Sequence, residues 1–412
     1  TSPTASGVPV YRMTQVSTCI SGSSCTGTAD EVKTTVSYGP QTSGTGNNLL
    51  PVSVTKQSGD GALTATTAMS YDAVGNLVSV DGPLSGTADT TVVRYDALRR
   101  KVGTIGPDPD GGGALKNPAQ RITYNTRGQV TLSEEGYTAG QTDAAWTGFT
   151  AGASVESTYT ASGQVETSTT KNGSTVYALT QYGYDAAGRL QCTAQRMNTA
   201  IYGSLPSSAC SLGTPGAAGP DRITKTTYDA ADRPTLVQTA YGTSAQANEV
   251  TTAYTDNGQV AYVVDGEGNR TTYEYDGHDR PIKTRYPVAT KGANSSSTTD
   301  YSQLTYGDNV RVTQQRLRDG NTISASYDNL SRVTQLSGST IDNRTMTYNL
   351  LGQPLAVTYT SGGQSVVNSY DAFGRLTAQT VPQGSISYQY DVASRMTRMT
   401  WPDAFYAVYD YD

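Results

Sequence analysis

The sequence predicts an all-β protein built from tandem β-hairpins. A short phrase recurs along the chain and reads SYDAFGRL at 369–376, QYDVASRM at 389–396 and SYDNLSRV at 326–333. From Tyr254 onward its tyrosines are separated by 21, 52, 21, 22, 20 and 21 residues. Between copies, apolar and polar residues alternate with a period of two. A fixed period combined with this alternation indicates repeated pairs of strands, each too small to bury an apolar face alone.

Twelve copies of the phrase can be aligned, eight with Tyr-Asp and four with Asn or Thr after the tyrosine. They lie at 70–77, 95–100, 124–130, 159–165, 183–190, 227–233, 254–260, 274–280, 326–333, 348–355, 369–376 and 389–396. Tyr306-Gly307-Asp308-Asn309 is predicted to be a degenerate copy in the widest step. The residues expected to shape the turns are Tyr71, Asp72, Gly75, Tyr184, Asp185, Gly188, Arg189, Tyr327, Asp328, Arg332, Tyr370, Asp371, Gly374, Arg375, Tyr390, Asp391 and Arg395.

A single repeat shows why a hairpin is expected. Residues 376–380 alternate, Pro382-Gln383-Gly384 interrupts the run, and residues 386–390 alternate again, which predicts two strands joined by a turn. The phrase itself is the second turn, with Asp371 at its first corner and Gly374 at its fourth. Other residues occupy the glycine position in several copies, and small polar ones tolerate unusual backbone angles better than branched ones. They are Ser331, Ser394, Asp232 and Asp279, with Arg99 fitting least well.

Composition excludes several classes of protein. The 412 residues are 16% charged, against a typical ~25%, and include 29 Tyr but only 3 Phe and 2 Trp. Tyrosine suits a half-buried sheet face. The net charge of −6 argues against a nucleic-acid or anionic-membrane partner, which would require clustered basic residues. No run of eighteen apolar residues exists, so no membrane span is expected.

The chain is expected to form one array, with residues 1–60 as a divergent hairpin region and residues 61–412 as the repeats proper. Loop inserts are expected near 103–120, 133–153, 192–222 and 285–302. Short helices are conceivable only at 137–148 or 243–250. The start, TSPTASGVPVY, lacks the features of a signal peptide, and the end, YAVYDYD, reaches the Tyr-Asp that would open another hairpin. We therefore expect the array to be truncated at 412 and to continue in a parent protein.

The four cysteines fall into two close pairs, Cys19/Cys25 and Cys192/Cys210. Four cysteines allow three connectivities, and sequence alone does not choose among them. Local pairing is favoured because members of different pairs are more than 160 residues apart. Two local disulfides would indicate an oxidising compartment, while four reduced thiols are the alternative. The spacings do not match those of a zinc site.

No catalytic constellation is evident, and we expect no enzyme. The single histidine, His278, lies at a turn corner where other copies carry apolar residues, and the recurring aspartates are interpreted as turn formers. No cofactor is expected. Calcium is considered at residues 106–113 (GPDPDGGG) and 264–270 (VDGEGNR), although neither completes a calcium-loop pattern.

Tyr-Asp-x-x-Gly-Arg-Leu at intervals of about twenty-one residues closely resembles the RHS/YD-repeat family, and the resemblance covers residues 70–412. Relatives include bacterial polymorphic toxins, the shell subunits of insecticidal toxin complexes, and teneurins. The resemblance implies hairpins wound into a spiral antiparallel sheet that forms a hollow shell or tube. In toxin members the shell encloses a C-terminal effector behind a self-cleaving element with a D-P-x-G-type boundary. Nothing in this sequence matches that element, so only the shell function is carried over.

The expected function is therefore a structural shell or fibre segment of a large secreted or cell-surface bacterial protein. Its expected partners are a C-terminal effector or further repeats of the parent chain, and glycans or other cell-surface proteins are also considered. The alternative is a carbohydrate-binding adhesin, because tyrosines with nearby Asn, Gln and Asp suit sugar stacking. A third hypothesis is that the chain is a folded passenger domain with enzymatic activity.

Overall fold

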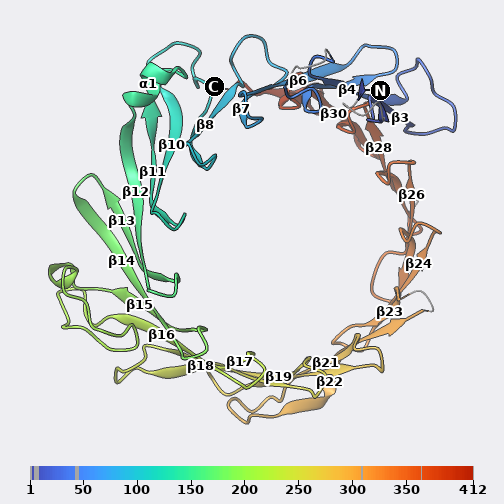
Figure 1. Cartoon of the computed structure of the whole chain (residues 1–412). Coiled ribbons are helices and arrows are strands. Elements are labelled where there is room, and N and C mark those ends of the chain that lie inside the picture. The colour runs from blue at the N-terminus through green and yellow to red at the C-terminus, as the bar shows by residue number, and fades with distance from the viewer. Residues whose placement is uncertain (1, 4–8, 42–45, 308–309, 363, 412) are drawn as a thin grey trace.

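The computed structural model describes residues 2–3, 9–41, 46–307, 310–362 and 364–411. Within these residues the chain is almost entirely β-structure. Figure 1 shows the strands following one another around a ring, from the N-terminal end to a C-terminal part that lies alongside the first strands again. The all-β fold with repeated hairpins is therefore confirmed.

The first strands are β1 (Ser2–Pro3), β2 (Pro9–Val10), β3 (Gln15–Cys19), β4 (Glu31–Tyr38), β5 (Pro51–Ser58), β6 (Thr64–Tyr71), β7 (Leu77–Asp81), β8 (Thr91–Tyr95), β9 (Lys101–Ile105), β10 (Asn117–Tyr124), β11 (Val130–Thr138), β12 (Thr150–Tyr159), β13 (Val165–Asn172), β14 (Thr175–Tyr184), β15 (Leu190–Arg196) and β16 (Arg222–Tyr228). They are followed by β17 (Pro234–Thr239), β18 (Ala247–Tyr254), β19 (Val260–Asp265), β20 (Arg270–Tyr275), β21 (Pro281–Pro287), β22 (Ser296–Tyr306), β23 (Val312–Arg316), β24 (Thr322–Tyr327), β25 (Val333–Gly338), β26 (Arg344–Tyr348), β27 (Pro354–Tyr359), β28 (Ser365–Tyr370), β29 (Leu376–Val381), β30 (Gly384–Tyr390), β31 (Met396–Thr400) and β32 (Tyr406–Val408). The helical segments are α1 (Asp143–Thr147) and the 3-10 turn η1 (Thr199–Ile201).

The sheet is a continuous antiparallel meander. From β3 to β32, each strand pairs with the next one in the chain, while β1 and β2 pair only with each other. Among the described residues, β3 pairs only with β4 and β32 only with β31, so the sheet has two free edges. Short connections between consecutive strands explain this topology, because a hairpin needs only a few residues to reverse direction.

The turn of the repeated phrase has the geometry that its residues favour. In the hairpin of β28 and β29, the backbone N–H of Gly374 donates to the carbonyl of Asp371, and the N–H of Asp371 donates to the carbonyl of Arg375. Gly374 has φ 80°, in the left-handed region where glycine is least strained. The strand register shifts between Ser369 and Tyr370, which is the bulge that accompanies such a turn.

The residues that replace glycine adopt the same conformation. Asp232, Asp279, Ser331 and Ser394 have φ between 60° and 67°, as the turn chemistry predicts for small polar residues. Arg99 also has φ 63°. Its guanidinium donates to the carbonyl of Val74 and to Asn76 Oδ1 in the preceding turn, contacts that offset the unfavourable backbone angle.

The ring is closed by contacts between its first and last parts, which we call the seam. The backbone N–H of Leu350 donates to the carbonyl of Ile20 at 2.9 Å. Lys56 Nζ donates to the carbonyl of Phe373 at 3.0 Å and lies 5.2 Å from the centre of the Phe373 ring. These pairs are more than 300 residues apart in sequence, so the strands complete one full turn before the chain meets itself (Figure 1).

The protein has little conventional core. Most strand residues are half-buried on both faces, as in a sheet of a single layer. The buried apolar cluster contains Cys192, Ala194, Ala209 and Ile223, and it lies where the segment after β15 folds back on the sheet. Stability must therefore come largely from contacts between neighbouring hairpins, as in other repeat proteins.

The expected inserts coincide with long connections, although the strands extend into them. The connections run over 106–116, 139–149, 197–221 and 288–295. Helix α1 lies within 137–148, whereas 243–250 holds turn residues followed by the start of β18, so a helix is absent from that second segment. Tyr306 and Gly307 behave as a further copy of the phrase, while Asp308 and Asn309 lie outside the described residues. The division at residue 60 stays a prediction.

Candidate functional site

The aspartate of the phrase organises its own turn. In the copy at 369–376, Asp371 Oδ1 accepts the backbone N–H groups of Phe373 at 2.9 Å and Arg375 at 3.0 Å. Its Oδ2 accepts Arg375 Nε at 2.7 Å. The carboxylate thus fixes the turn through the backbone and holds the arginine side chain at the same time.

The same ion pair recurs in seven copies, with Nε–Oδ2 distances of 2.6 to 2.8 Å. The pairs are Asp96–Arg100, Asp185–Arg189, Asp229–Arg233, Asp276–Arg280, Asp328–Arg332, Asp371–Arg375 and Asp391–Arg395. The hydrogen bond from the Arg280 guanidinium is the main cause that lowers the pKa of Asp276 to about 2. The Arg189 guanidinium likewise lowers the pKa of Asp185. The lowered pKa values of Asp276 and Asp185 keep these two carboxylates ionised for pairing, which is unsuited to general acid catalysis near neutral pH.

The tyrosine of the phrase links each hairpin to the one before it. In all twelve aligned copies, the hydroxyl donates to a backbone carbonyl of an earlier strand at 2.6 to 3.0 Å. The pairs are Tyr71–Pro51, Tyr95–Leu77, Tyr124–Lys101, Tyr159–Val130, Tyr184–Val165, Tyr228–Leu190, Tyr254–Pro234, Tyr275–Val260, Tyr327–Val312, Tyr348–Val333, Tyr370–Pro354 and Tyr390–Leu376. Tyr306 and Tyr411 make the same bond, to Pro281 and Met396. The acceptor is the first residue of the strand that follows the preceding turn, so each bond crosses from one repeat to the next.

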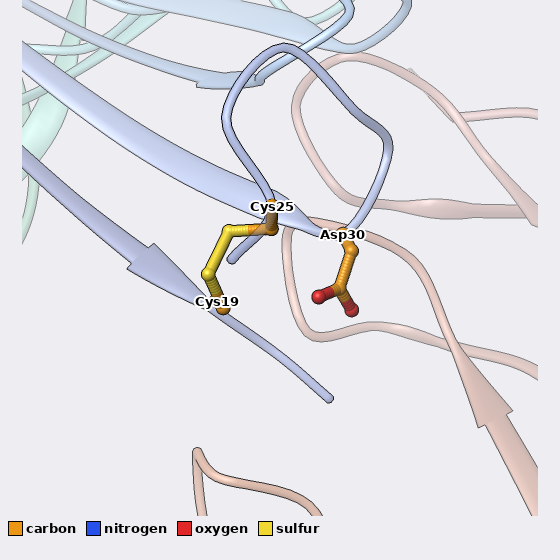
Figure 2. Close-up of side chains that lie close together, drawn as sticks. All are labelled: Cys19, Cys25 and Asp30. Carbon is orange, nitrogen blue, oxygen red and sulfur yellow. A yellow bond between two sulfur atoms is a disulfide. The ribbon is translucent and has the colours of Figure 1, made fainter. Parts of the chain in front are cut away.

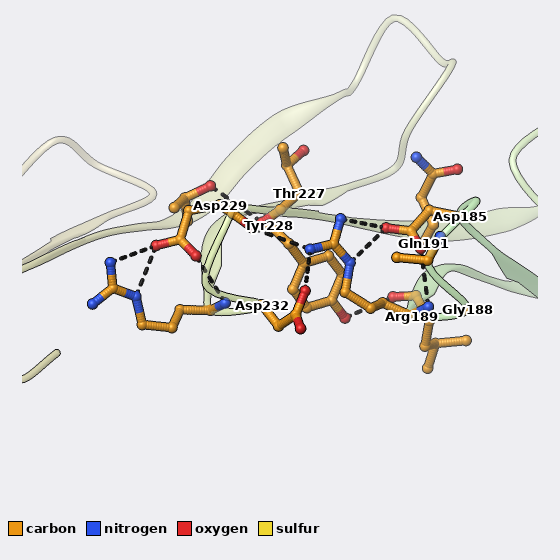
Figure 3. A network of polar contacts seen from close by, with 12 residues as sticks. Asp185, Gly188, Arg189, Gln191, Thr227, Tyr228, Asp229 and Asp232 are labelled. Atoms are coloured by element: carbon orange, nitrogen blue, oxygen red, sulfur yellow. Dashed lines mark hydrogen bonds and ion pairs between the residues drawn. The ribbon is translucent and has the colours of Figure 1, made fainter.

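The arginine of the phrase makes the reverse link, toward the following repeat. Figure 3 shows Arg189 lying between its own Asp185 and the next turn, where it contacts the carbonyl of Asp229 at 3.0 Å and Asp232 Oδ1 at 2.6 Å. Its guanidinium also lies 4.8 Å from the centre of the Tyr228 ring. Each of the seven paired arginines stacks on the tyrosine of the following copy in this way, at 4.4 to 4.9 Å.

Three of the copies that lack arginine keep a similar link through glutamine. Gln353 Nε2 donates to the carbonyl of Gly374 in the next turn at 2.7 Å, and Gln129 and Gln164 reach Gly163 and Gly188 in the same manner. Tyrosine hydroxyls and arginine or glutamine side chains therefore form a ladder of contacts that runs from turn to turn at one end of the strands. We call this set of contacts the turn ladder. Its geometry suits holding repeats together at a fixed curvature.

The structure places the predicted turn residues at or beside hairpin turns. The links that the tyrosine hydroxyl and the arginine make between repeats were not predicted from the sequence. A buried ion pair that joins the end of β15 to the start of β16 was not predicted either. Arg196 and Asp221, with side chains 0% and 1% exposed, are 2.7 Å apart. Burial alone raises the pKa of Asp221, but the N–H groups of Met197 and Gly213 and the Arg196 guanidinium outweigh it and lower the pKa overall.

The cysteines form the local disulfides Cys19–Cys25 and Cys192–Cys210. Cys19, Cys25 and Asp30 lie close enough together to suggest a metal site. Figure 2 shows, however, that the two sulfur atoms are bonded to each other, which removes the thiolates that a metal would need.

The other candidate sites show turn chemistry. His278 is exposed on its turn, where its backbone N–H donates to Asp276 Oδ1. In the considered calcium segment 264–270, Asp265 accepts hydrogen bonds from Glu267 and Asn269 at a hairpin tip. In 106–113, Asp110 accepts the N–H groups of Gly113 and Leu115. Calcium binding at either segment stays a proposal.

None of the helical segments in the described ranges is long and apolar enough to cross a membrane.

Comparisons with known proteins identify the repeats. The model of the RHS repeat family matches residues 254–291 and 369–404. A search of curated proteins found no match. Among solved structures, the chain is similar to TcdB2-TccC3-TEV, with TM-score 0.38 and 12% identity over 90% of this chain and 23% of that one. TcdB2-TccC3 without its hypervariable C-terminal region gives TM-score 0.36 and 13% identity over 90% of this chain and 22% of that one.

A porin-like protein from Bacteroides uniformis gives TM-score 0.16 and 10% identity over 74% of this chain and 98% of that one. These TM-scores are low, so the fold assignment rests on the strand pairing itself. The chain spans less than a quarter of the length of the TcdB2-TccC3 structures. The family model matches two stretches of the array, residues 254–291 and 369–404, and these stretches are RHS repeats.

Proposed function

We propose that this chain is a wall segment of a shell in a large secreted or cell-surface protein, and that the shell encloses an effector belonging to the same parent protein. The observation that carries the proposal is the seam. A meander of hairpins that completes a full turn, with Leu350 bonded to Ile20, is suited to forming a closed wall. The enclosed effector itself is implied by the resemblance to toxin members of the family.

The turn ladder supports a structural role. The distinctive groups of the repeats are used in structural contacts: Tyr390 donates its hydroxyl to a carbonyl of the preceding repeat, and Arg375 pairs with the aspartate of its own turn and stacks on the tyrosine ring of the following repeat. Nothing in the geometry of the described repeats favours the alternative of a carbohydrate-binding adhesin, because these hydroxyls already have protein partners. The proposal assigns the chain no catalytic step.

The two disulfides support location in an oxidising compartment, since such bonds persist mainly in secreted and cell-surface proteins. Secretion is tested by fractionating cells that produce the parent protein. The proposal expects the repeats in the medium or on the cell surface, and recovery only from the cytoplasm contradicts that part of it.

Enclosure is tested by limited proteolysis of the purified parent protein. The effector region is expected to resist protease while the repeats are folded, and to become sensitive once urea opens the array. As a control, the isolated effector region is digested under native conditions. If the effector region is cut equally fast in the intact parent and in isolation, the repeats do not enclose it.

A further inference from the structure

The seam buries turn residues whose equivalents are more exposed elsewhere in the ring. Asn349 and Ala372 are each 3% exposed. In turns away from the seam, Ala186 and Ala230, which are equivalent to Ala372, are exposed, and Asp185 and Asp229, which are equivalent to Asn349, are half-buried. Ile20, which supplies the carbonyl for Leu350, is 8% exposed. The seam is therefore a packed contact between the tips of the first hairpins and the turns of the last ones.

One side of this contact is a small loop closed by a disulfide. Cys19 immediately precedes Ile20, and its bond to Cys25 closes the loop (Figure 2). Asp30 holds the same loop from the other side, because its carboxylate accepts the N–H groups of Ser21 at 3.0 Å and Gly22 at 3.4 Å. The carbonyl of Ile20 is thus positioned by a covalent closure on one side and by hydrogen bonds on the other.

The disulfide borders a groove at the seam. The groove has a volume of about 500 Å³ and is lined by both cysteines of the loop and by Leu350 and Leu351 of the opposing turn. Cys19 is partly exposed, whereas Cys25 is 6% exposed. Of the two cysteines, Cys19 is therefore the one that a small thiol reagent in the groove reaches more readily.

We propose that the Cys19–Cys25 disulfide is a redox-labile clasp that holds the seam of the ring closed. A thiolate of a dithiol reductant attacks Cys19 Sγ, the sulfur–sulfur bond breaks, and Cys25 leaves as a thiolate that takes up a proton. The second thiol of the reductant then displaces Cys19, which is released as a thiol. Two electrons and two protons pass to the protein, and the reductant leaves as a disulfide.

Reduction removes the covalent closure that positions Ile20, and the bond from Leu350 weakens as a result. The ring then opens at the seam while the hairpins elsewhere keep their turn ladder. Such a wall is closed in an oxidising compartment and loosened in a reducing one. The inference goes beyond the proposed function, since it holds whether or not the ring encloses an effector.

Amide hydrogen exchange tests the clasp, with dithiothreitol as reductant. Exchange at Leu350 is expected to accelerate at least about tenfold on reduction, since native disulfides typically contribute more than the ~1.4 kcal/mol that corresponds to a tenfold change. Gly352 is an internal control, because its N–H donates to Asn349 within the same turn, and its exchange is expected to change less. Unchanged exchange at Leu350 overturns the proposal.

Cysteine variants distinguish the effect of the Cys19–Cys25 disulfide from that of the Cys192–Cys210 disulfide. The double variant Cys19→Ala/Cys25→Ala is expected to show fast exchange at Leu350 without reductant, and no further response to it. The matched control, Cys192→Ala/Cys210→Ala, removes a disulfide remote from the seam and is expected to keep the response. If both variants accelerate Leu350 equally, or if exchange rises equally in turns away from the seam such as the one at Gly188, the disulfide is a general stabiliser and the proposal fails.

A proline variant removes the hydrogen bond between Leu350 and Ile20 by changing the donor residue. Leu350 is the second residue of its turn, a position that proline favours, so Leu350→Pro removes the N–H donor with little cost to the turn itself. Exchange at Ser21 and Gly22 is expected to rise, and reduction is expected to add little more. Ala186→Pro, at the same position of a turn away from the seam, is the control. Protection of Ser21 and Gly22 that is unaffected by Leu350→Pro contradicts the clasp.

Discussion

The tyrosine hydroxyl of each repeat is predicted to contribute a similar stability at every position. Tyr390→Phe removes the donor to the Leu376 carbonyl, a bond of 2.9 Å, while keeping the ring on which Arg375 stacks at 4.9 Å. A typical intramolecular hydrogen bond contributes ~0.5–1.5 kcal/mol, so the free energy of unfolding is expected to fall by about 1 kcal/mol. Tyr390→Ala also removes the ring and is expected to cost up to about 3 kcal/mol, the low end for a truncated aromatic, because this side chain is only half-buried.

The same pair of substitutions is made at Tyr327, Tyr348 and Tyr370, whose hydroxyls donate at 2.7, 2.8 and 3.0 Å. Urea unfolding measures the decrease in the free energy of unfolding. Hydrogen exchange shows whether the destabilisation is confined to neighbouring repeats, since repeat arrays need not unfold in a single step. The control is Tyr177→Phe. That side chain is 65% exposed, and its substitution is expected to change stability by less than ~0.5 kcal/mol.

Uniform losses at the four positions support a structural role for the phrase. Four neutral Tyr→Phe variants would show that the hydroxyl bonds contribute nothing, which refutes the reasoning about the turn ladder. One tyrosine whose alanine variant abolishes glycan binding without changing the unfolding transition would instead identify a ligand site.

Three further predictions concern individual groups. The Asp276–Arg280 pair stabilises the fold at pH values above the ordinary aspartate pKa, and this contribution is lost as the pH falls through about 2. In an acid titration followed by circular dichroism, Arg280→Ala should therefore unfold at a higher pH than the wild type. Acid transitions at the same pH contradict this. Asp221→Asn leaves Arg196 buried without its counter-ion and should lower the free energy of unfolding, measured in urea, by ~3–5 kcal/mol. A decrease below ~1 kcal/mol would show that the ion pair is not essential to its segment. Gly374→Val places a β-branched residue at φ 80° and should lower the melting temperature more than Gly374→Ser, because serine already adopts this conformation at positions 331 and 394 whereas β-branched residues rarely do. Equal shifts refute the turn assignment.

The parts of the fold that depend on local chemistry follow from the sequence. Asp371 and Gly374 are separated by the spacing of a single turn, and the hydrogen bonds that they make lie within that turn. The alternation of residues 376–380 and 386–390 likewise predicts β29 and β30 closely. Such features need only a few neighbouring residues, so one copy of the repeat contains all the information required.

The role of the tyrosine hydroxyl was harder to predict, because its acceptor lies in another repeat at a variable distance along the chain. Tyr390 reaches back 14 residues, whereas Tyr228 reaches back 38 across an insert. A signal did exist: 29 tyrosines against 3 phenylalanines indicate that the hydroxyl, and not only the ring, is required. Similarly, Arg196 and Asp221 are the only charged residues between 192 and 221, a pattern consistent with a buried pair.

The seam is beyond sequence reasoning altogether. Whether Leu350 meets Ile20 depends on the curvature accumulated over all the hairpins between them, and each hairpin contributes only a small rotation. The residues near position 20 or position 350 therefore contain no local pattern that predicts the accumulated curvature.

The central claim, that the hairpins complete a full turn and close on themselves, is tested most directly by photo-crosslinking. A benzophenone amino acid replaces Leu350, whose side chain is 60% exposed and lines the groove with residues 17–19 and 22–26. The same group at Leu330, which is 68% exposed on a turn away from the seam, is the control. We expect crosslinked peptides that join position 350 to residues 17–26, and none of these from position 330. Crosslinks from position 350 that reach only neighbouring repeats would show that the ring is not closed.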